Sequence, residues 1–282
     1  MKSGWLIYSK ENAVQNSSYI NWFIDEADKQ SLTLSLIIRE EMTIGIVNNK
    51  QCILVKSEVV VPPDFAIVRT IETLLNLHLE NMGVRVFNSS EISRICNNKA
   101  LTHHYINQLG IPMVNTIYAK RETIQDDPPL SFPFIVKEVS GRGGKQVYFI
   151  ENQTDWINCK MSIQTDIIIQ SSDVQLGKDL RVFVVGKEII AAILRESSTD
   201  FRANFKLGGT AKIYQLNDQE KKLIYKIINY FDFGMVGIDF LIGHNGELLF
   251  NEIEDVVGSR TLSIADNVNI LEKYITLIKN AL

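Results

Sequence analysis

The sequence predicts an α/β protein with α+β lobes, and three observations indicate this class. Strand-like and helix-like patterns alternate over the first third of the chain, which is typical of a mostly parallel sheet covered by helices. Two apolar strands then flank a glycine-rich stretch at 140–145. Near the C-terminus, two more strands form an acidic hairpin at 235–255. We therefore expect more than one lobe, with polar chemistry gathered in the second half of the chain.

Length, composition and charge limit the classes of function. The chain has 282 residues, of which 45% are apolar and 22% are charged, so a sizeable core and an ordinary globular composition are expected. The net charge is −4 without a lysine or arginine run, which argues against duplex nucleic acid and anionic membranes as partners. No apolar stretch could span a bilayer and no cleavage-type signal opens the chain. Three dispersed cysteines (Cys52, Cys96, Cys159) favour reduced thiols in a cytoplasm. The sequence leaves open whether the protein forms a homo-oligomer.

The N-terminal third is predicted to hold strands at 5–8, 32–38, 65–68 and 84–87, and shorter β-rich runs at 52–55 and 59–61. Helical spacing occurs over 20–27 and again from 70 to 82, where Gly83 acts as a stop. No G-x-G-x-x-G motif occurs, so the sequence gives no support to a dinucleotide-binding fold.

One helix is predicted from about 91 to 109, with Ser89 or Ser90 as its N-cap. The strands expected after it are 134–137, 147–150, 167–170, 180–185 and 188–194. Asn217, with Glu220 three residues later, predicts a capped helix start. A closing helix is expected at about 264–282.

The stretch 140–145 has the composition of a phosphate-binding loop. Three glycines in four residues leave backbone N–H groups free to approach phosphate oxygens, and Arg142 and Lys145 add positive charge. The loop is not of the Walker type, because G-x-x-x-x-G-K-[ST] is absent and a strand follows it. A flexible hairpin turn is the alternative. Lys137, set at the end of the preceding apolar strand, favours a nucleotide.

The C-terminal hairpin concentrates carboxylates on one side. A turn at 244–246 joins its two strands, and alternation puts Glu252 and Glu254 on the same face. If Asp239 faces that side across the ladder, three carboxylates converge, and oxygen-only ligation suits Mg²⁺. The alternative is a solvated hairpin edge with scattered acids. The histidines and cysteines are not clustered, so no zinc site is expected.

Several short motifs follow one another in a recognisable order. They are Lys99, Lys137 with its glycine loop, a hinge-like segment at 168–172, D-x-R at Asp179 and Arg181, D-F-R-x-N at 200–204 with Gly208-Gly209, G-x-D at Asp239, and N-E-x-E at 251–254. This ordered set resembles the ATP-grasp superfamily, and within it the RimK-like carboxylate–amine ligases of the alpha-L-glutamate type. The resemblance is close over 89–260 and only general before that.

The resemblance implies an ATP-grasp fold with a pre-ATP-grasp α/β domain at 1–96, a central lid subdomain at 97–171 and a C-terminal subdomain with the metal site at 172–282. It also implies ATP and Mg²⁺ as cofactors, with Mn²⁺ as an alternative ion. The implied ATP-binding residues are Lys99, Lys137, Ser140, Gly141, Arg142, Gly143, Gly144, Gln170, Ser171 and Asp179. The implied metal ligands are Asp239, Glu252 and Glu254, the implied catalytic residues are Arg202, Asn204 and Arg195, and the implied substrate residues are Arg260 and Ser259.

Within this set, Gln170 and Ser171 align with the hinge that reads the adenine edge, and Asp179 aligns with the ribose-binding acid. The chain departs from the family in three places. Gln170 stands where glutamate is common, and its amide oxygen can still accept the adenine amino proton. Glu254 stands where asparagine is usual and remains an oxygen ligand. Residues 255–260 replace a run of small residues, proline and glycine beside the substrate pocket, which leaves the substrate open.

We therefore expect an ATP-dependent ligase that joins a carboxylate to an amine through an acyl phosphate, adding an amino acid to a peptide or to another amino acid. Its expected partners are small-molecule or peptide carboxylates and amines. Two alternatives stay open: a graspetide-type peptide macrocyclase, and an ATP-binding regulatory module without turnover. Arg195 and Arg260 are either surface ion pairs or guanidinium clamps for a substrate carboxylate.

Overall fold

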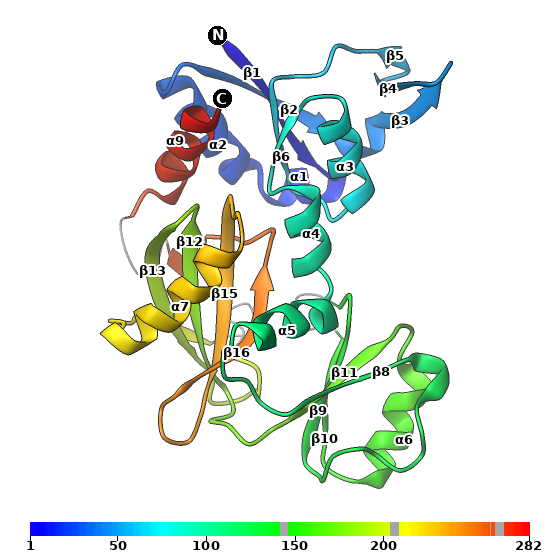
Figure 1. Cartoon of the computed structure of the whole chain (residues 1–282), viewed down its shortest axis with the longest axis vertical. Helices are drawn as coiled ribbons and strands as arrows, with labels where there is room; N and C mark the ends of the chain where they lie inside the picture. The colour runs from blue at the N-terminus through cyan, green and yellow to red at the C-terminus, as the bar shows by residue number, and fades with distance from the viewer. Residues whose placement is uncertain (142–145, 204–208, 260, 263–267) are drawn as a thin grey trace.

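The computed structural model of the chain describes residues 1–141, 146–203, 209–259, 261–262 and 268–282 (Figure 1). Its strands form a parallel sheet with a small three-stranded sheet beside it, a four-stranded antiparallel sheet and a five-stranded antiparallel sheet. Helices accompany each of the larger sheets, so the predicted mixed α/β class is confirmed. No helix in the described ranges is long and apolar enough to cross a membrane.

The N-terminal sheet is parallel throughout and has the strand order β2-β1-β6-β7. Its strands are β1 (Lys2–Tyr8), β2 (Leu32–Ile38), β6 (Phe65–Val68) and β7 (Arg85–Phe87), and its helices are α1 (Lys10–Gln15), α2 (Ser17–Lys29) and α3 (Thr73–Asn81). Since β2 lies on one side of β1 and β6 on the other, the winding of the sheet reverses between β1 and β6. In open α/β sheets, ligands bind outside the carboxyl ends of the strands at such a reversal.

A three-stranded sheet is inserted between β2 and β6. It consists of β3 (Met42–Val47), β4 (Lys50–Val55) and β5 (Glu58–Val59), and follows the short 3-10 helix η1 (Arg39–Glu41). The sequence did not predict β3. The sequence signal for this hairpin is the pair Asn48-Asn49 in the turn between β3 and β4. Both residues adopt positive φ (51° and 61°), as such a tight turn requires.

The single helix predicted over 91–109 is wrong, because two helices are present, α4 (Ser90–Cys96) and α5 (Lys99–Gln108). Ser89 caps α4, as expected, and accepts a hydrogen bond from the Ile92 amide. The break follows from Asn98, whose side chain accepts from the Leu101 amide and so starts a second helix. The break puts Lys99 at the first residue of α5.

The four-stranded sheet has the order β10-β9-β11-β8 and is antiparallel. Its strands are β8 (Thr116–Ala119), β9 (Phe134–Glu138), β10 (Val147–Ile150) and β11 (Ile167–Ser171), and they are accompanied by η2 (Arg121–Thr123) and α6 (Gln153–Ser162). Trp156 and Cys159 of α6 pack on Phe134 and Ile167 of the sheet. The sequence did not predict β8 or α6, since neither has a strong apolar periodicity.

The five-stranded sheet has the order β14-β13-β12-β15-β16. Its strands are β12 (Lys178–Val185), β13 (Glu188–Glu196), β14 (Thr210–Ile213), β15 (Met235–Ile242) and β16 (Leu248–Glu254), with helices α7 (Asp218–Tyr230) and α9 (Ile270–Ala281). The predicted acidic hairpin is confirmed as β15 and β16. The predicted capping box at Asn217 and Glu220 is also confirmed.

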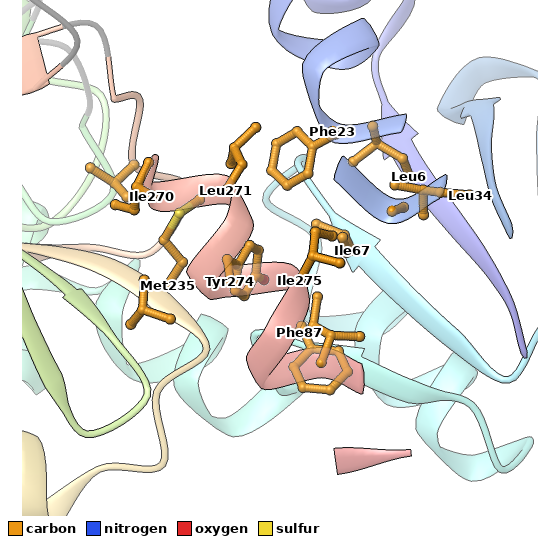
Figure 2. Packing of buried hydrophobic residues seen from close by; sticks show 14 of the residues in the cluster. Leu6, Phe23, Leu34, Ile67, Phe87, Met235, Ile270, Leu271, Tyr274 and Ile275 are labelled. Carbon is orange, nitrogen blue, oxygen red and sulfur yellow. The ribbon is translucent and has the colours of Figure 1, made fainter. Parts of the chain in front are cut away.

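One apolar core joins the N-terminal sheet to one face of the five-stranded sheet. In Figure 2, Leu271, Tyr274 and Ile275 of α9 lie between side chains of the N-terminal lobe and Met235 of β15. The opposite face of the sheet packs on α4, α5 and α7. On the face toward the N-terminal lobe, β12 runs from buried Phe183 and Val185 to Arg181 and Asp179, so an apolar core gives way to charged side chains along the same face.

Candidate active site

The charged end of this sheet face is assembled by strand register. Asp239 of β15 lies opposite Arg181 on one side and Glu252 on the other. Glu254 lies opposite Gly237, two residues before Asp239. Residues paired or separated by two positions share a face. The three acids predicted as metal ligands therefore occupy one face, as the alternation of the hairpin indicated.

Asp239 is the most deeply buried of these acids and is 1% exposed. The Arg181 guanidinium donates to both of its carboxylate oxygens at 2.7 and 2.6 Å, and Arg195 Nη2 donates to Oδ2 at 2.9 Å. Burial pushes the pKa of Asp239 upward, but the charges of Arg181 and Arg195 outweigh burial and lower the pKa to about 2. Asp239 is therefore ionised throughout the physiological range.

Asp179 and Arg195 form the next layer of the network. Arg195 Nε and Nη2 donate to the two Asp179 oxygens at 2.6 and 2.7 Å, and Arg195 is 6% exposed. Burial raises the pKa of Asp179 to about 6, against the lowering effect of the Arg195 charge. Arg195 is thus in an ion pair, but a buried one that bridges two carboxylates. Asp179, predicted to bind ribose, is held by this arginine.

Glu252 and Glu254 are the accessible carboxylates, each with 36% of its side chain exposed. Arg181 Nη1 lies 2.5 Å from Glu254 Oε2, so Arg181 links Glu254 to Asp239. Lys99 Nζ lies 3.7 Å from Glu252 Oε2. The acids are held by these cations, and no group of three or more His, Cys, Asp or Glu side chains within the described ranges is arranged to hold a metal ion. Ligation by Asp239, Glu252 and Glu254 stays a prediction.

Both predicted phosphate-binding lysines reach β16 from the four-stranded sheet and α5. Lys137 Nζ donates to Asn251 Oδ1 at 2.6 Å, and Lys99 Nζ donates to the Gly141 carbonyl beside its contact with Glu252. Burial lowers the pKa of Lys137 to about 8, although the Glu252 charge acts in the opposite direction. The ladder between β15 and β16 shifts register beside Asn251, which explains how this amide comes to face Lys137.

The glycine-rich loop is described only at its start. Ser140 is exposed, and the Gly141 amide donates to the Glu138 carbonyl at 3.0 Å. A Cβ atom on Gly141 would lie 3.2 Å from that carbonyl and 2.9 Å from Gln146 Oε1, so the tight approach favours glycine. Arg142, Gly143, Gly144 and Lys145 lie outside the described residues.

The predicted hinge residue Gln170 is 1% exposed. Its Nε2 lies 3.1 Å from His103 Nε2 and donates to Thr116 Oγ1 at 3.0 Å. Burial lowers the pKa of His103 to about 4, so this imidazole is neutral. Since Nδ1 of His103 lies 2.7 Å from the Lys99 carbonyl, it carries the proton and Nε2 accepts from Gln170. The amide orientation of Gln170 is thereby set, and its Oε1 is buried without a hydrogen-bond partner.

Of the remaining predicted residues that the structure describes, Ser171 ends β11, Arg202 lies between β13 and β14, and Ser259 follows β16. Arg202 donates to both oxygens of Asp200 at 2.9 and 2.7 Å, and its guanidinium carbon lies 5.3 Å from the Phe201 ring centre. Phe201 stacks on Phe149 of β10, which connects this segment to the four-stranded sheet. Ser171 donates its amide to the Asn115 carbonyl, and Ser259 is 3% exposed in the loop after β16. Asn204 and Arg260 lie outside the described residues.

Sequence reasoning missed Asn251, His103 and the bridging role of Arg181. Asn251 and Arg181 belong to motifs already noted, N-E-x-E and D-x-R, so their positions carried a signal without indicating their contacts. His103 carried none, because only the packing of α5 against β11 brings it to Gln170.

Comparison with known proteins agrees with this geometry. The family model of the RimK-like ATP-grasp domain matches residues 96–278. The glutamate–LysW ligase ArgX of Sulfurisphaera tokodaii is 27% identical over 230 residues, which are 77% of this chain and 82% of that protein. Human N-acetylaspartylglutamate synthase A is 31% identical over 206 residues, which are 68% of this chain and 52% of that protein.

A solved structure shows the same fold over the whole length. The ATP-grasp ligase PsnB, in complex with a phosphomimetic variant of a minimal precursor, Mg and ADP, superposes with a TM-score of 0.71 at 14% identity. The match covers 98% of this chain and 97% of PsnB. The expected ATP-grasp fold is therefore confirmed, and the chain is an ATP-grasp ligase that belongs to the RimK-like ATP-grasp family.

Proposed function

We propose that the protein uses ATP to activate a carboxylate as an acyl phosphate and then joins it to the amine of an amino acid or peptide, releasing ADP and phosphate. One observation carries the proposal: Lys99 and Lys137, from two different elements, both end on β16 beside Glu252. The two ammonium groups can bind phosphate oxygens. The accessible carboxylate beside them would repel those oxygens unless a metal cation lay between.

The side chains fit the charge changes of this reaction. The substrate carboxylate oxygen attacks the γ-phosphorus, the bond to the ADP oxygen breaks, and negative charge spreads over the transferring oxygens. Lys99, Lys137 and Arg202 are the groups that would stabilise this charge. The amine nitrogen then attacks the acyl carbon and loses a proton, and the bond from that carbon to the phosphate oxygen breaks as phosphate leaves. Because an acyl phosphate hydrolyses easily, the packing of Phe201 on Phe149 would help to keep water away.

Mg²⁺ suits this donor set, because Glu252, Glu254 and Asp239, which would hold the ion, are all oxygen donors on one sheet face. When bound, the ion would neutralise phosphate charge as a Lewis acid. Arg181 already supplies a cation between Asp239 and Glu254, so binding requires that Glu254 and one Asp239 oxygen exchange their arginine contacts for the ion.

The hinge offers a specific test of adenine recognition. The buried Gln170 Oε1 has no partner, and its orientation leaves an acceptor for the adenine amino group, whereas guanine presents a carbonyl oxygen at that position. We expect Gln170→Met to weaken ATP binding roughly tenfold and to reduce the preference for ATP over GTP. Isothermal titration with both nucleotides measures this, with Gln164→Met, at an exposed position, as the control. An unchanged ATP-to-GTP ratio would contradict the assignment.

The pKa of Lys137 predicts how the affinity for ATP changes at alkaline pH. Its pKa of about 8 means that the ligand-free enzyme loses the lysine charge as pH rises through 8. Bound phosphate favours the protonated form, so binding takes up a proton above this pH. The Kd for ATP should therefore increase about tenfold per pH unit above pH 8. Lys137→Arg keeps the charge and should flatten this limb; an identical alkaline limb in that variant would rule out Lys137 as its source.

An ADP-release screen tests the proposed function directly. Purified protein with ATP and Mg²⁺ is presented with amino acids and short peptides as carboxylate and amine, starting with L-glutamate because the names of both sequence relatives include glutamate. ADP release that requires both substrates, with an amide in the product, supports the ligase. Tight ATP binding without ADP release from any mixture would instead favour a regulatory module, and an intramolecular ester or amide in a peptide would favour a macrocyclase.

A further inference from the structure

Arg69 is a cation for which the described residues supply no anion. It follows β6, its Nη2 donates to the Val257 carbonyl at 2.8 Å, and its Nε atom is buried without a hydrogen-bond partner. Among the described residues it forms no ion pair, in contrast to Arg181 and Arg195 of the neighbouring network. Removing a guanidinium from water is costly unless an opposite charge or a full set of hydrogen bonds compensates. A negatively charged ligand would supply what this site lacks.

The polar groups around Arg69 are also incompletely bonded; Tyr8 is buried, and Tyr19 and Thr70 are half-buried, as is Arg69 itself. Its guanidinium carbon lies 5.9 Å from the ring centre of Tyr8 and 5.8 Å from that of Tyr19. The hydroxyl atoms of Tyr8, Tyr19 and Thr70 are buried without a well-directed hydrogen bond, although the Tyr8 hydroxyl comes near the Arg69 guanidinium and the Tyr19 hydroxyl comes near Ser259. We call Tyr8, Tyr19, Arg69 and Thr70 the Arg69 cluster. It offers one cation and three hydroxyl donors, with aromatic rings that limit access of water.

The cluster lies where an open α/β sheet binds ligands. Tyr8 is the last residue of β1 and Arg69 directly follows β6. These are the two strands between which the winding of the N-terminal sheet reverses. Both residues are at the carboxyl ends of their strands, the position at which the two diverging connections leave room for a ligand.

Val257 connects the Arg69 cluster to the candidate active site. Its carbonyl accepts from Arg69, and its Cγ2 lies 2.8 Å from the point that a Gly237 Cβ would occupy. Arg181 Cδ lies 3.4 Å from the same point. Arg181 holds Asp239 and Glu254. Val257 therefore lies between the Arg69 cluster and the sheet face that carries Asp239 and Glu254.

We propose that the Arg69 cluster binds a free carboxylate of the amino acid or peptide substrate, with the guanidinium as its counter-ion and tyrosine and threonine hydroxyls as further donors. This inference rests on the proposed ligase function and identifies the substrate class as one that carries a carboxylate beyond the group being activated. Arginine is suited to this role because its planar donors match the two oxygens of a carboxylate.

The kinetic test uses Arg69→Gln, which removes the charge. We expect the KM for the carboxylate-bearing substrate to rise at least about tenfold while the KM for ATP changes less than about twofold, the pattern of lost ground-state binding. Arg69→Lys should recover part of the loss. Arg85→Gln is the matched control, since Arg85 also joins the N-terminal lobe to a C-terminal carbonyl, that of Ala281, but is exposed. Equal effects at positions 69 and 85 would overturn the proposal, and a selective rise in the KM for ATP would assign the cluster to phosphate instead.

Two further measurements keep the test independent of turnover and of folding. Sodium L-glutamate, compared with sodium chloride at equal ionic strength, should raise the Tm of the wild type by about 3 °C more than that of Arg69→Gln. Glutamine and isoglutamine each lack one carboxylate, and at least one of them should lose the effect. If Arg69→Gln does not fold, Tyr8→Phe takes its place: this variant removes only a hydroxyl and should reduce the Tm shift. A glutamate-dependent shift without ADP release would reject the ligase and keep the anion site, whereas turnover without any dependence on Arg69 would do the reverse.

Discussion

Replacing Glu252 by glutamine is expected to lower kcat for ADP release by about 100-fold or more, because a neutral amide binds Mg²⁺ poorly and the phosphate charge loses its counter-ion. The fold should remain intact. The Glu252 side chain is 36% exposed, and its ion pair with Lys99 spans 3.7 Å, so little stability depends on it.

The measurement is steady-state ADP release over a range of Mg²⁺ concentrations, with circular dichroism to check the fold. Glu247→Gln is the control, since Glu247 is in the same hairpin but at its exposed turn, where it accepts from the Asn245 amide. Turnover close to that of the wild type in the Glu252 variant would remove this residue from the proposed metal site. A loss that excess Mg²⁺ partly restores would support it.

Replacing Arg181 by leucine is expected to destabilise the protein by about 3–5 kcal/mol, the usual cost of breaking a buried ion pair by removing one partner. Asp239 is 1% exposed and would keep only its single contact with Arg195, while Glu254 would lose its arginine. For a chain of this size the Tm should decrease by roughly 10 °C.

Urea and thermal unfolding measure this effect. Arg39→Leu is the control, because the Arg39–Glu72 pair has a similar 2.7 Å distance at a more exposed place and should contribute less than about 1 kcal/mol. The double variant Arg181→Leu/Asp239→Leu should regain part of the lost stability, since it leaves fewer buried charges unpaired. Equal losses for Arg181→Leu and Arg39→Leu would show that the buried network contributes little to stability.

Local signals predicted several elements correctly because their physical cause is local. The Asn217–Glu220 capping box starts α7 through side chains three residues apart, and the turn within 244–246 lets β15 and β16 pair. The helix break at Asn98 has an equally local cause, but the apolar pattern of 91–109 continues across it. Periodicity therefore predicted one helix where an asparagine cap produces two.

The sequence by itself determined the family, the acidic hairpin and the candidate lysines, since these depend on residue order and on the alternation of side chains along a strand. Only the tertiary structure decided which charges meet. Arg181 pairs with Asp239 and Glu254, Lys137 donates to Asn251, and Arg69 lies beside two tyrosines with no ion pair to a carboxylate in the described part of the chain. Tyr8 and Arg69 are 61 positions apart, and Arg69 and Val257 are 188 apart, so no local pattern relates them. The energy of a charge depends on its burial and its partners, and both are set by how sheets and loops distant in sequence pack together.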